Sequence, residues 1–329
     1  MKSAENSLAK KRFNLSKWLN IIGPLLGLVF VFALFSAIGP ESFRSSRNIE
    51  TILRQTAIVG TAALGMTLVI ISAGIDLSVG SVIALSTVVI ALLLNLGLNP
   101  FLCALAGILA GALCGFVNGV LITLLKVVPF IVTLGTLLIV RGVAKGLANE
   151  QKVDAPMIWL NNLLSALKPS ERWMIVSPGV WLMILLAIMV WLLLTYTRLG
   201  RYIFAIGSNE NTARVSGVPT DRVKLIVYTL GSFFAGLSGL MQFSRLTVGD
   251  PTVAVGLELD VIAAVVIGGG SLSGGEGSVL GSLVGALIMT TIRSGCSQMG
   301  FPNWVQEIVT GAIIIIAVAL DRLRRRRIS

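Results

Sequence analysis

The chain has 329 residues, of which 55% are apolar and 12% are charged, and its formal net charge is +11. A soluble domain carries roughly 25% charged residues, so a surface this poor in charge would aggregate in water, and lipid is the expected solvent. Because no soluble part remains to bind it, we expect no nucleic-acid partner despite the positive charge.

The basic residues gather at the two ends of the chain and suggest its orientation. One cluster precedes the first apolar run and another follows the last: Lys10, Lys11, Arg12 and Lys17, and then Arg322, Arg324, Arg325, Arg326 and Arg327. Such clusters fit the positive-inside rule and can touch anionic lipid headgroups. We therefore expect a cytoplasmic tail at 1–18, a transmembrane domain at 19–320 and a basic cytoplasmic tail at 321–329.

Apolar runs that can each cross a bilayer follow one another along the chain, since a spanning helix needs about 20 such residues. They lie at 20–39, 55–73, 79–95, 101–125, 128–147, 178–196, 224–244, 254–270, 278–295 and 304–320. The first run is longer than the apolar part of a signal peptide and lacks a clear A-x-A site, so we expect a retained span. The pattern predicts an all-α integral membrane protein of about ten spans with both termini cytoplasmic.

This orientation assigns a side to each connecting segment. Residues 40–54, 148–177, 245–253 and 296–303 are expected outside, and residues 126–127 and 197–223 inside. In the outer loop 148–177, Trp159 and Trp173 form either a docking surface for a soluble partner or an aromatic belt at the membrane interface.

Two regions do not read as ordinary spans. The first runs from Ala57 to Leu94 and is interrupted by glycine, serine and aspartate between Ser72 and Ser81. The second is the apolar run up to Ile267, which is followed at once by a glycine-rich stretch. Broken backbone at membrane depth is tolerated inside protein or beside a watery cavity, and paired breaks point to a translocation path. The candidate residues of this path are Thr67, Asp76, Ser78, Asp260, Gly268 and Gly269.

The two regions also share a Gly-Ser-Val sequence, at Gly80 to Val82 and at Gly277 to Val279, which arises either from an internal duplication or by chance. Glycines recur every fourth residue at 107, 111, 115 and 119, and again at 277, 281 and 285. Such faces allow helices to approach closely in lipid. They serve either packing within one chain or a dimer interface.

Carboxylates beside these breaks have two possible roles. In a pore, Asp76 could accept hydrogen bonds from a hydroxylated solute, because a charge at membrane depth is expensive unless it is paired, hydrated or functional. Alternatively, Asp76 and Ser78 satisfy free backbone N–H groups at the start of the next helix. Glu258 and Asp260 pose the same choice.

The segment 198–223 is the longest inner connection. Ser208 or Asn209 can cap a short amphipathic helix, and Glu210 suits its first turn. Gly217 suits the position after the helix, and Pro219 prevents continuation. The helix either docks a soluble partner at the cytoplasmic face or is a surface helix without one.

The residue types exclude several kinds of chemistry. Histidine is absent, and Cys103, Cys114 and Cys296 form no C-x-x-C pair, so the sequence supports no zinc site, disulfide framework or histidine relay. No Gly-Lys dipeptide exists, so there is no P-loop for a nucleotide. We expect no catalytic residues, no metal and no cofactor.

Four blocks of residues, in order, carry a family resemblance. They are Gly65-Met66-Thr67-Leu68-Val69-Ile70 with Gly74-Ile75-Asp76-Leu77-Ser78-Val79-Gly80-Ser81; Thr197-Arg198-Leu199-Gly200-Arg201; Gly207-Ser208-Asn209-Glu210 with Ala213, Ser216 and Gly217; and Glu258-Leu259-Asp260 through Gly268-Gly269, with Gly274, Gly275 and Gly277. With these blocks the chain resembles the membrane permease of ribose-type ABC sugar importers over roughly residues 48–320.

The resemblance implies a transport mechanism in the bacterial cytoplasmic membrane. Two permease chains, identical or paralogous, form a path for a monosaccharide, a periplasmic sugar-binding protein delivers it, and a cytoplasmic ABC ATPase drives the change of state. The family's coupling segment matches Gly207, Asn209, Glu210, Ala213 and Gly217. Gly270 stands where a hydroxyl residue is common in the family.

The residues leave rival functions open. An ion-coupled secondary transporter would use Asp76 as its ion or proton site, as discontinuous helices often do. A membrane enzyme would need a cluster of acids or metal ligands, and a channel would need a charged ring or a repeated filter. Neither pattern is visible in the sequence.

Overall fold

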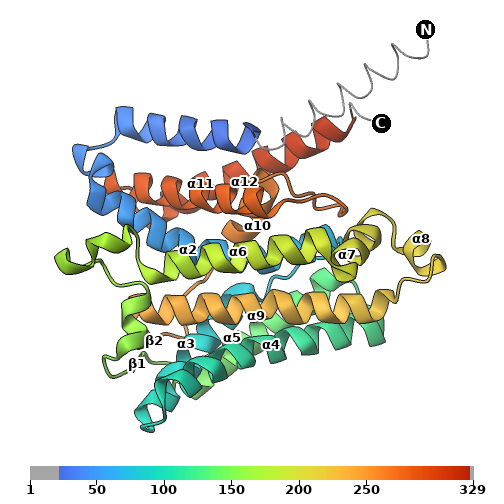
Figure 1. The fold of residues 1–329 in the computed structure, drawn as a ribbon, viewed down its shortest axis with the longest axis horizontal. Helices are drawn as coiled ribbons and strands as arrows, with labels where there is room; N and C mark the ends of the chain where they lie inside the picture. Colours follow the sequence, from blue (N-terminus) through green and yellow to red (C-terminus); the bar gives the residue numbers. More distant parts are fainter. Residues whose placement is uncertain (1–21, 327–329) are drawn as a thin grey trace.

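A computed structural model describes residues 22–326, which fold into an assembly of helices with almost no strand (Figure 1). The predicted all-α class is confirmed, and the predicted tail at 1–18 lies outside the described residues. The long elements are the helix Ile22–Ile38, α2 (Ser46–Ile71), α3 (Val79–Asn95), α4 (Pro100–Leu125), α5 (Pro129–Leu147), α6 (Pro178–Tyr196), α7 (Arg198–Ser208), α8 (Glu210–Val215), α9 (Thr220–Leu246), α10 (Leu257–Ile267), α11 (Val279–Gln298) and α12 (Asn303–Arg326). The short elements are η1 (Glu41–Arg44), η2 (Trp159–Leu163), η3 (Pro169–Met174), β1 (Val153–Asp154) and β2 (Val248–Gly249).

Six of the described helices are long and apolar enough to cross a membrane, namely α2, α4, α5, α6, α9 and α11. The other four predicted spans fall on shorter apolar stretches, at Ile22–Ile38, in α3, in α10 and in the first part of α12. α10 has 11 residues and therefore rises only about 16 Å. It reaches only part of the way across a bilayer, so the span expected at 254–270 is shorter than the sequence predicted.

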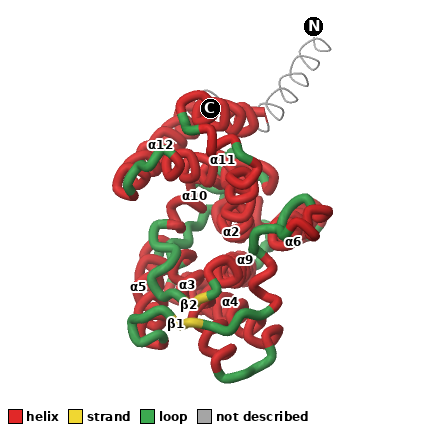
Figure 2. The backbone as a smooth tube through the Cα atoms, turned by 90° about the vertical axis from the view of Figure 1, so that its left-hand side faces the viewer, coloured by secondary structure: helices red, strands yellow, loops and turns green. Residues whose placement is uncertain are grey.

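The helices lie in layers that are clear in the end-on view (Figure 2). α11 and α12 form the top, α3, α4 and α9 form the bottom, and α2 and α10 lie between them. The central helix α2 is almost entirely buried: 89% of its apolar window is covered, compared with 22% for α5 at the edge. A helix that is apolar and buried on all sides is typical of the centre of a large assembly.

The glycine faces are packing surfaces within this chain. A Cβ added to Gly111 of α4 would lie 2.7 Å from the carbonyl oxygen of Ser232 in α9, and Gly115 faces the next turn of the same helix. Gly281 and Gly285 of α11 lie equally close to the backbone of α10. Small residues thus let two pairs of helices meet backbone to backbone, which confirms the internal-packing interpretation over the dimer interface.

The connecting segments gather at two opposite ends (Figure 1). At one end, which we call the ribbon side, β1 pairs antiparallel with β2, and Asn95 at the end of α3 donates a hydrogen bond to the carbonyl of Asp154. At the other end, the α8 side, lie α7, α8 and both broken segments, 72–78 and 268–278, together with the end of α12. The predicted tail at 321–329 continues α12 as helix up to Arg326.

The shared Gly-Ser-Val sequence does not mark equivalent positions. Ser278 caps α11 by accepting a hydrogen bond from Gly281 N–H, whereas Ser81 lies inside α3, whose cap position is Ser78. The cap positions of α3 and α11 are Ser78 and Ser278. The shared Gly-Ser-Val residues therefore lie about one helical turn apart relative to the start of their helices.

Candidate functional site

The segment expected to hold one short helix holds two. α7 begins after Thr197, whose hydroxyl accepts the N–H of Gly200, and ends at Ser208. Asn209 then has extended backbone and its side chain accepts the N–H of Thr212, which starts α8. Of the two predicted caps, Asn209 is therefore the correct one, and Ser208 is the last residue of the helix α7, which the sequence analysis missed.

α8 ends as the sequence predicted. Gly217 has a φ of +86°, in the left-handed region where glycine is favoured. Its N–H bonds to the carbonyl of Arg214 and the N–H of Val218 bonds to that of Ala213, both at 3.0 Å. This pair of bonds is the Schellman motif, which satisfies carbonyls that a helix end otherwise leaves free.

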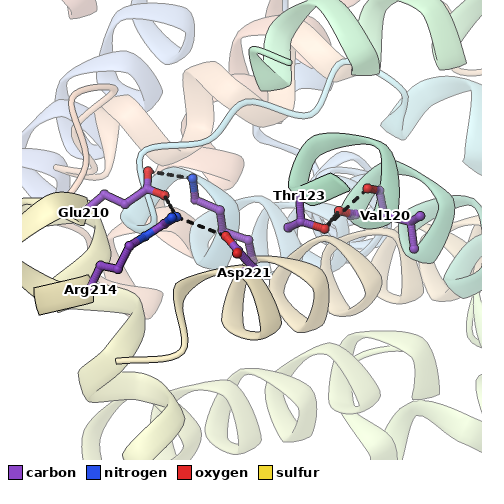
Figure 3. A network of polar contacts seen from close by, with 7 residues as sticks. Val120, Thr123, Glu210, Arg214 and Asp221 are labelled. Atoms are coloured by element: carbon purple, nitrogen blue, oxygen red, sulfur yellow. Dashed lines mark hydrogen bonds and ion pairs between the residues drawn. The ribbon is translucent and has the colours of Figure 1, made fainter. Parts of the chain in front are cut away.

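An ion-pair network holds α8 against the start of α9 (Figure 3). Glu210 pairs with Lys224 at 2.6 Å and with Arg214 at 3.3 Å, and Arg214 also reaches Asp221 at 3.1 Å. The Lys224 side chain is 18% exposed and that of Glu210 is 36% exposed, so their pair is partly shielded from water. α8 is thus attached to α9 by charges as well as by the connecting turn.

One apolar side chain projects from this charged segment. Val215, the last residue of α8, is 90% exposed, whereas Ala213 is buried at 5% and fixes the helix against the rest of the chain. Val215 is thus left uncovered at the end of a helix that is capped at both ends.

Asp76 is buried at 1% exposure, and hydrogen bonds reach both of its oxygens. Oδ1 accepts the N–H of Ser78 at 2.9 Å and its hydroxyl at 2.6 Å, and Oδ2 accepts the hydroxyl of Ser232 in α9 at 3.2 Å. Asn118 of α4 donates to Ser78 Oγ at 3.1 Å. Asp76 thus accepts the N–H of Ser78, which stands at the cap position of α3, and Ser232 ties it to a distant helix. The Ser78 side chain itself makes no capping bond, so only the Asp76 half of the capping interpretation is seen.

Thr67 and Gly268 meet around one serine of α11. The Thr67 hydroxyl donates to Ser282 Oγ at 2.7 Å, and a Cβ added to Gly268 would lie 2.6 Å from Ser282 N. Gly269 follows with a φ of +91° and ends α10. These residues fix the close approach of α2, α10 and α11.

The acids of α10 have different roles. Glu258 Oε1 accepts the N–H of Gly256 at 3.2 Å, which is a capping bond. Asp260 does not cap: its Oδ2 pairs with Arg293 of α11 at 2.6 Å. Asp260 is 1% exposed and its Oδ1 has no hydrogen-bond partner in the described part of the chain, whereas Arg293 is 42% exposed.

The predicted path residues therefore occupy three places: Asp76 and Ser78 between α3, α4 and α9, the group around Ser282, and Asp260 nearer the ribbon side. Arg293 was not predicted from the sequence, although an arginine inside an apolar run is itself a signal, since such a charge requires a partner. Within residues 22–326, no group of three acidic, cysteine or histidine residues is placed to hold a metal ion.

The ribbon side is held by a second polar cluster. Arg141 of α5 donates to the carbonyls of Pro251 at 2.9 Å and Val253 at 2.7 Å, and Lys152 pairs with Asp250 at 3.5 Å. Burial raises the pKa of Asp250, but hydrogen bonds from Thr252 and the nearby Lys152 ammonium outweigh it, so the pKa of this carboxyl lies below its usual value. These contacts fasten the turn between α9 and α10.

Comparison with known proteins agrees with this architecture. A family model described as "Branched-chain amino acid transport system / permease component" matches residues 48–318. The ribose import permease protein RbsC of Bacillus subtilis is 38% identical over 331 residues, covering 98% of this chain and 99% of that protein. RbsC of Escherichia coli K12 is 36% identical, covering 97% and 99%, and the fructose import permease protein FrcC of Rhizobium meliloti is 37% identical, covering 92% and 85%.

No solved structure matches the chain. The family model covers most of the sequence, and the similarity to these relatives extends over nearly the whole of each chain. The chain therefore belongs to this family of transport-system permeases, and it is an integral membrane protein.

Proposed function

We propose that this protein is the permease of an ABC importer that carries a monosaccharide across the bacterial cytoplasmic membrane. It hydrolyses no ATP itself; a separate cytoplasmic ATPase powers it, a periplasmic sugar-binding protein feeds it, and a second permease chain completes the path. Support comes from relatives that are ribose, allose, fructose and arabinose permeases. The proposal includes about ten membrane spans with both termini in the cytoplasm, and it places the α8 side at the cytoplasmic face of the membrane.

The observation that carries the proposal is the construction of α8. A helix of 6 residues with a side-chain cap at one end and a Schellman motif at the other is locally rigid. Its network to α9 fixes its position, and Val215 is left uncovered. We assign the coupling role to Gly207, Asn209, Glu210, Ala213 and Gly217, with Val215 added as the side chain that contacts the ATPase.

The proposed path uses Thr67, Asp76, Ser78, Asp260, Gly268 and Gly269. Among these, Asp260 is best suited to meet a solute, because its Oδ1 lacks a partner in the described chain while Arg293 beside it is half exposed. A half-exposed guanidinium within a spanning helix does not face lipid without a large penalty, so water or the second chain covers it. Carboxylate and guanidinium together accept from and donate to sugar hydroxyls.

Reconstitution tests the function directly. The permease is placed in proteoliposomes with its ATPase and binding protein, and uptake is followed for radiolabelled ribose, allose, fructose and arabinose, with leucine as the amino-acid alternative suggested by the family description. We expect uptake of a sugar that requires ATP and all three components. Uptake of leucine alone, or uptake by the permease without ATP, would overturn the proposal.

Asp76 separates the importer from an ion-coupled transporter. Asp76→Asn keeps an oxygen that can accept both bonds from Ser78, so an importer should retain ATP-driven uptake. An ion- or proton-coupled transporter that uses this carboxylate should lose uptake entirely. The measurement is the initial uptake rate with ATP and, separately, with a proton or sodium gradient.

A further inference from the structure

The two broken segments and the end of α7 meet at one point on the α8 side. The N–H of Gly275, in the α10–α11 break, donates to the carbonyl of Ile71, the last residue of α2, at 2.9 Å. One break thus caps the helix that leads into the other, because carbonyls at a helix end lack partners within their own helix.

Gly207, near the end of α7, lies against the same carbonyl. A Cβ added to Gly207 would collide with the Ile71 oxygen and would lie 2.5 Å from Gly275 N. A Cβ added to Gly274 would lie 2.6 Å from the carbonyl oxygen of Gly207. Three stretches of backbone are therefore in direct contact, with no flexible side chain between them.

The ends of α2 and α10 share one geometry but differ in one residue. Both helices end in a Schellman motif. In α2 the N–H of Ala73 donates to the carbonyl of Ile70, and the N–H of Gly74 donates to that of Val69. In α10 the N–H of Gly269 donates to the carbonyl of Val266. In α10 the left-handed position is a glycine, with a φ of +91°, whereas in α2 it is Ala73, with a φ of +62°. A methyl group at a positive φ is strained, and such strain concentrates where structure serves function.

The Ala73 methyl group explains why that strain is kept. A Cβ added to Gly274 would lie 2.6 Å from the Ala73 Cβ, so the methyl group fills the space beside Gly274. Ala73 thus contributes a side-chain contact between the first break and the α10–α11 turn.

α7 is in turn joined to α8, since Asn209 ends the one helix and caps the other. Packed backbones are stiff, so a displacement of α8 passes through Gly207 to both breaks. We propose that the junction of Gly207, Gly274, Gly275, Ile71 and Ala73 transmits ATPase movement to both breaks, with Gly207 and Ala73 as positioning residues. This inference rests on the proposed importer function.

The test measures the number of sugar molecules taken up per ATP hydrolysed in the reconstituted importer. Ala73→Gly relieves the strained φ, so the variant should be at least as heat-stable as the wild type, and it removes the methyl contact. We expect the uptake-to-ATP ratio to fall roughly two- to thirtyfold, the range that mutations along coupled networks produce. Gly207→Ala, which forces the backbones apart, should lower the ratio further.

Two matched controls separate this role from general effects on folding. Ala254→Gly relieves a similar strain, a φ of +61°, on the ribbon side, and Gly146→Ala adds a methyl group where no atom lies within 4 Å. Both should keep the wild-type ratio. The uptake-to-ATP ratio of Gly207→Ala is interpreted only if this variant elutes as a folded complex in size-exclusion chromatography. If Gly207→Ala does not fold, the ratio measured for Ala73→Gly tests the inference.

An Ala73→Gly importer with the wild-type ratio would overturn the inference, and so would parallel losses of uptake and ATP hydrolysis in folded Gly207→Ala. Failure of the proposed function looks different. In that case the wild-type protein itself shows no ATP-dependent sugar uptake, whatever the variants do.

Discussion

The ion pairs of Glu210 hold α8 against α9, so removal of the Glu210 charge should loosen the helix. Glu210→Gln preserves the size and helix preference of the side chain but removes its charge, and with it the pairs to Lys224 at 2.6 Å and Arg214 at 3.3 Å. Exposed pairs contribute about 0.2–1 kcal/mol each, and the shielded Lys224 pair belongs at the upper end. Together they stabilise the docked α8 by about 1.5 kcal/mol.

A loss of that size corresponds to about a tenfold rise in the fraction of time that α8 is detached, since 1.4 kcal/mol is a factor of ten. Hydrogen–deuterium exchange read by mass spectrometry on the purified permease measures it directly. We expect the amides of α8 and of Gly217 and Val218 to exchange about tenfold faster in the variant, while α2 and α9 remain protected. The same variant should couple ATP to uptake less efficiently.

The control for this experiment is Glu307→Gln, which removes an equal charge from an exposed position near the start of α12. It should leave exchange in α8 and sugar uptake unchanged. If Glu210→Gln leaves exchange in α8 at the wild-type rate, the ion pairs do not hold the helix and the reasoning is wrong. High salt should also raise wild-type exchange in α8, because salt screens exposed charges.

Three further changes are predicted from single sites. Gly111→Leu should abolish folding of the detergent-purified chain, because its side chain would overlap the α9 backbone, whereas Gly135→Leu, with open space around it, should fold and melt normally. Asp250→Asn should lower the melting temperature at neutral pH and flatten its fall as the pH drops below the ordinary aspartate pKa of about 3.9. A carboxyl with a lowered folded-state pKa stabilises the protein above its unfolded pKa and loses that contribution on protonation. An acid transition equal to that of the wild type would contradict this. Asp260→Asn should lower the melting temperature, but by less than the about 3–5 kcal/mol of a fully buried pair, because the Arg293 left unpaired is half exposed. Asp260→Asn with Arg293→Met should recover most of the melting temperature, and no recovery would mean that the pair is not the cause.

Local signals in the sequence predicted most of the helices and several of their ends, although α7 was missed and α2 begins earlier than predicted. Apolar runs of spanning length marked α2, α4 and α9, and glycines and serines marked where the backbone breaks. Asn209 and Gly217 predicted the limits of α8 because a cap and a left-handed turn depend on only a few neighbouring residues. Family resemblance then added a function that no single residue of the chain could indicate.

Which of these elements pack against one another could be read from the three-dimensional fold alone. The glycine stripe of α4 fits a dimer interface as well as it fits α9 until the partner helix is placed. Asp76 and Ser232 are 156 residues apart in the sequence, and Asp260 reaches an arginine on another helix. The junction of Gly207 with Ile71 and Gly275 is of the same kind, since close contacts between distant backbones depend on how whole helices pack, and no local pattern encodes that.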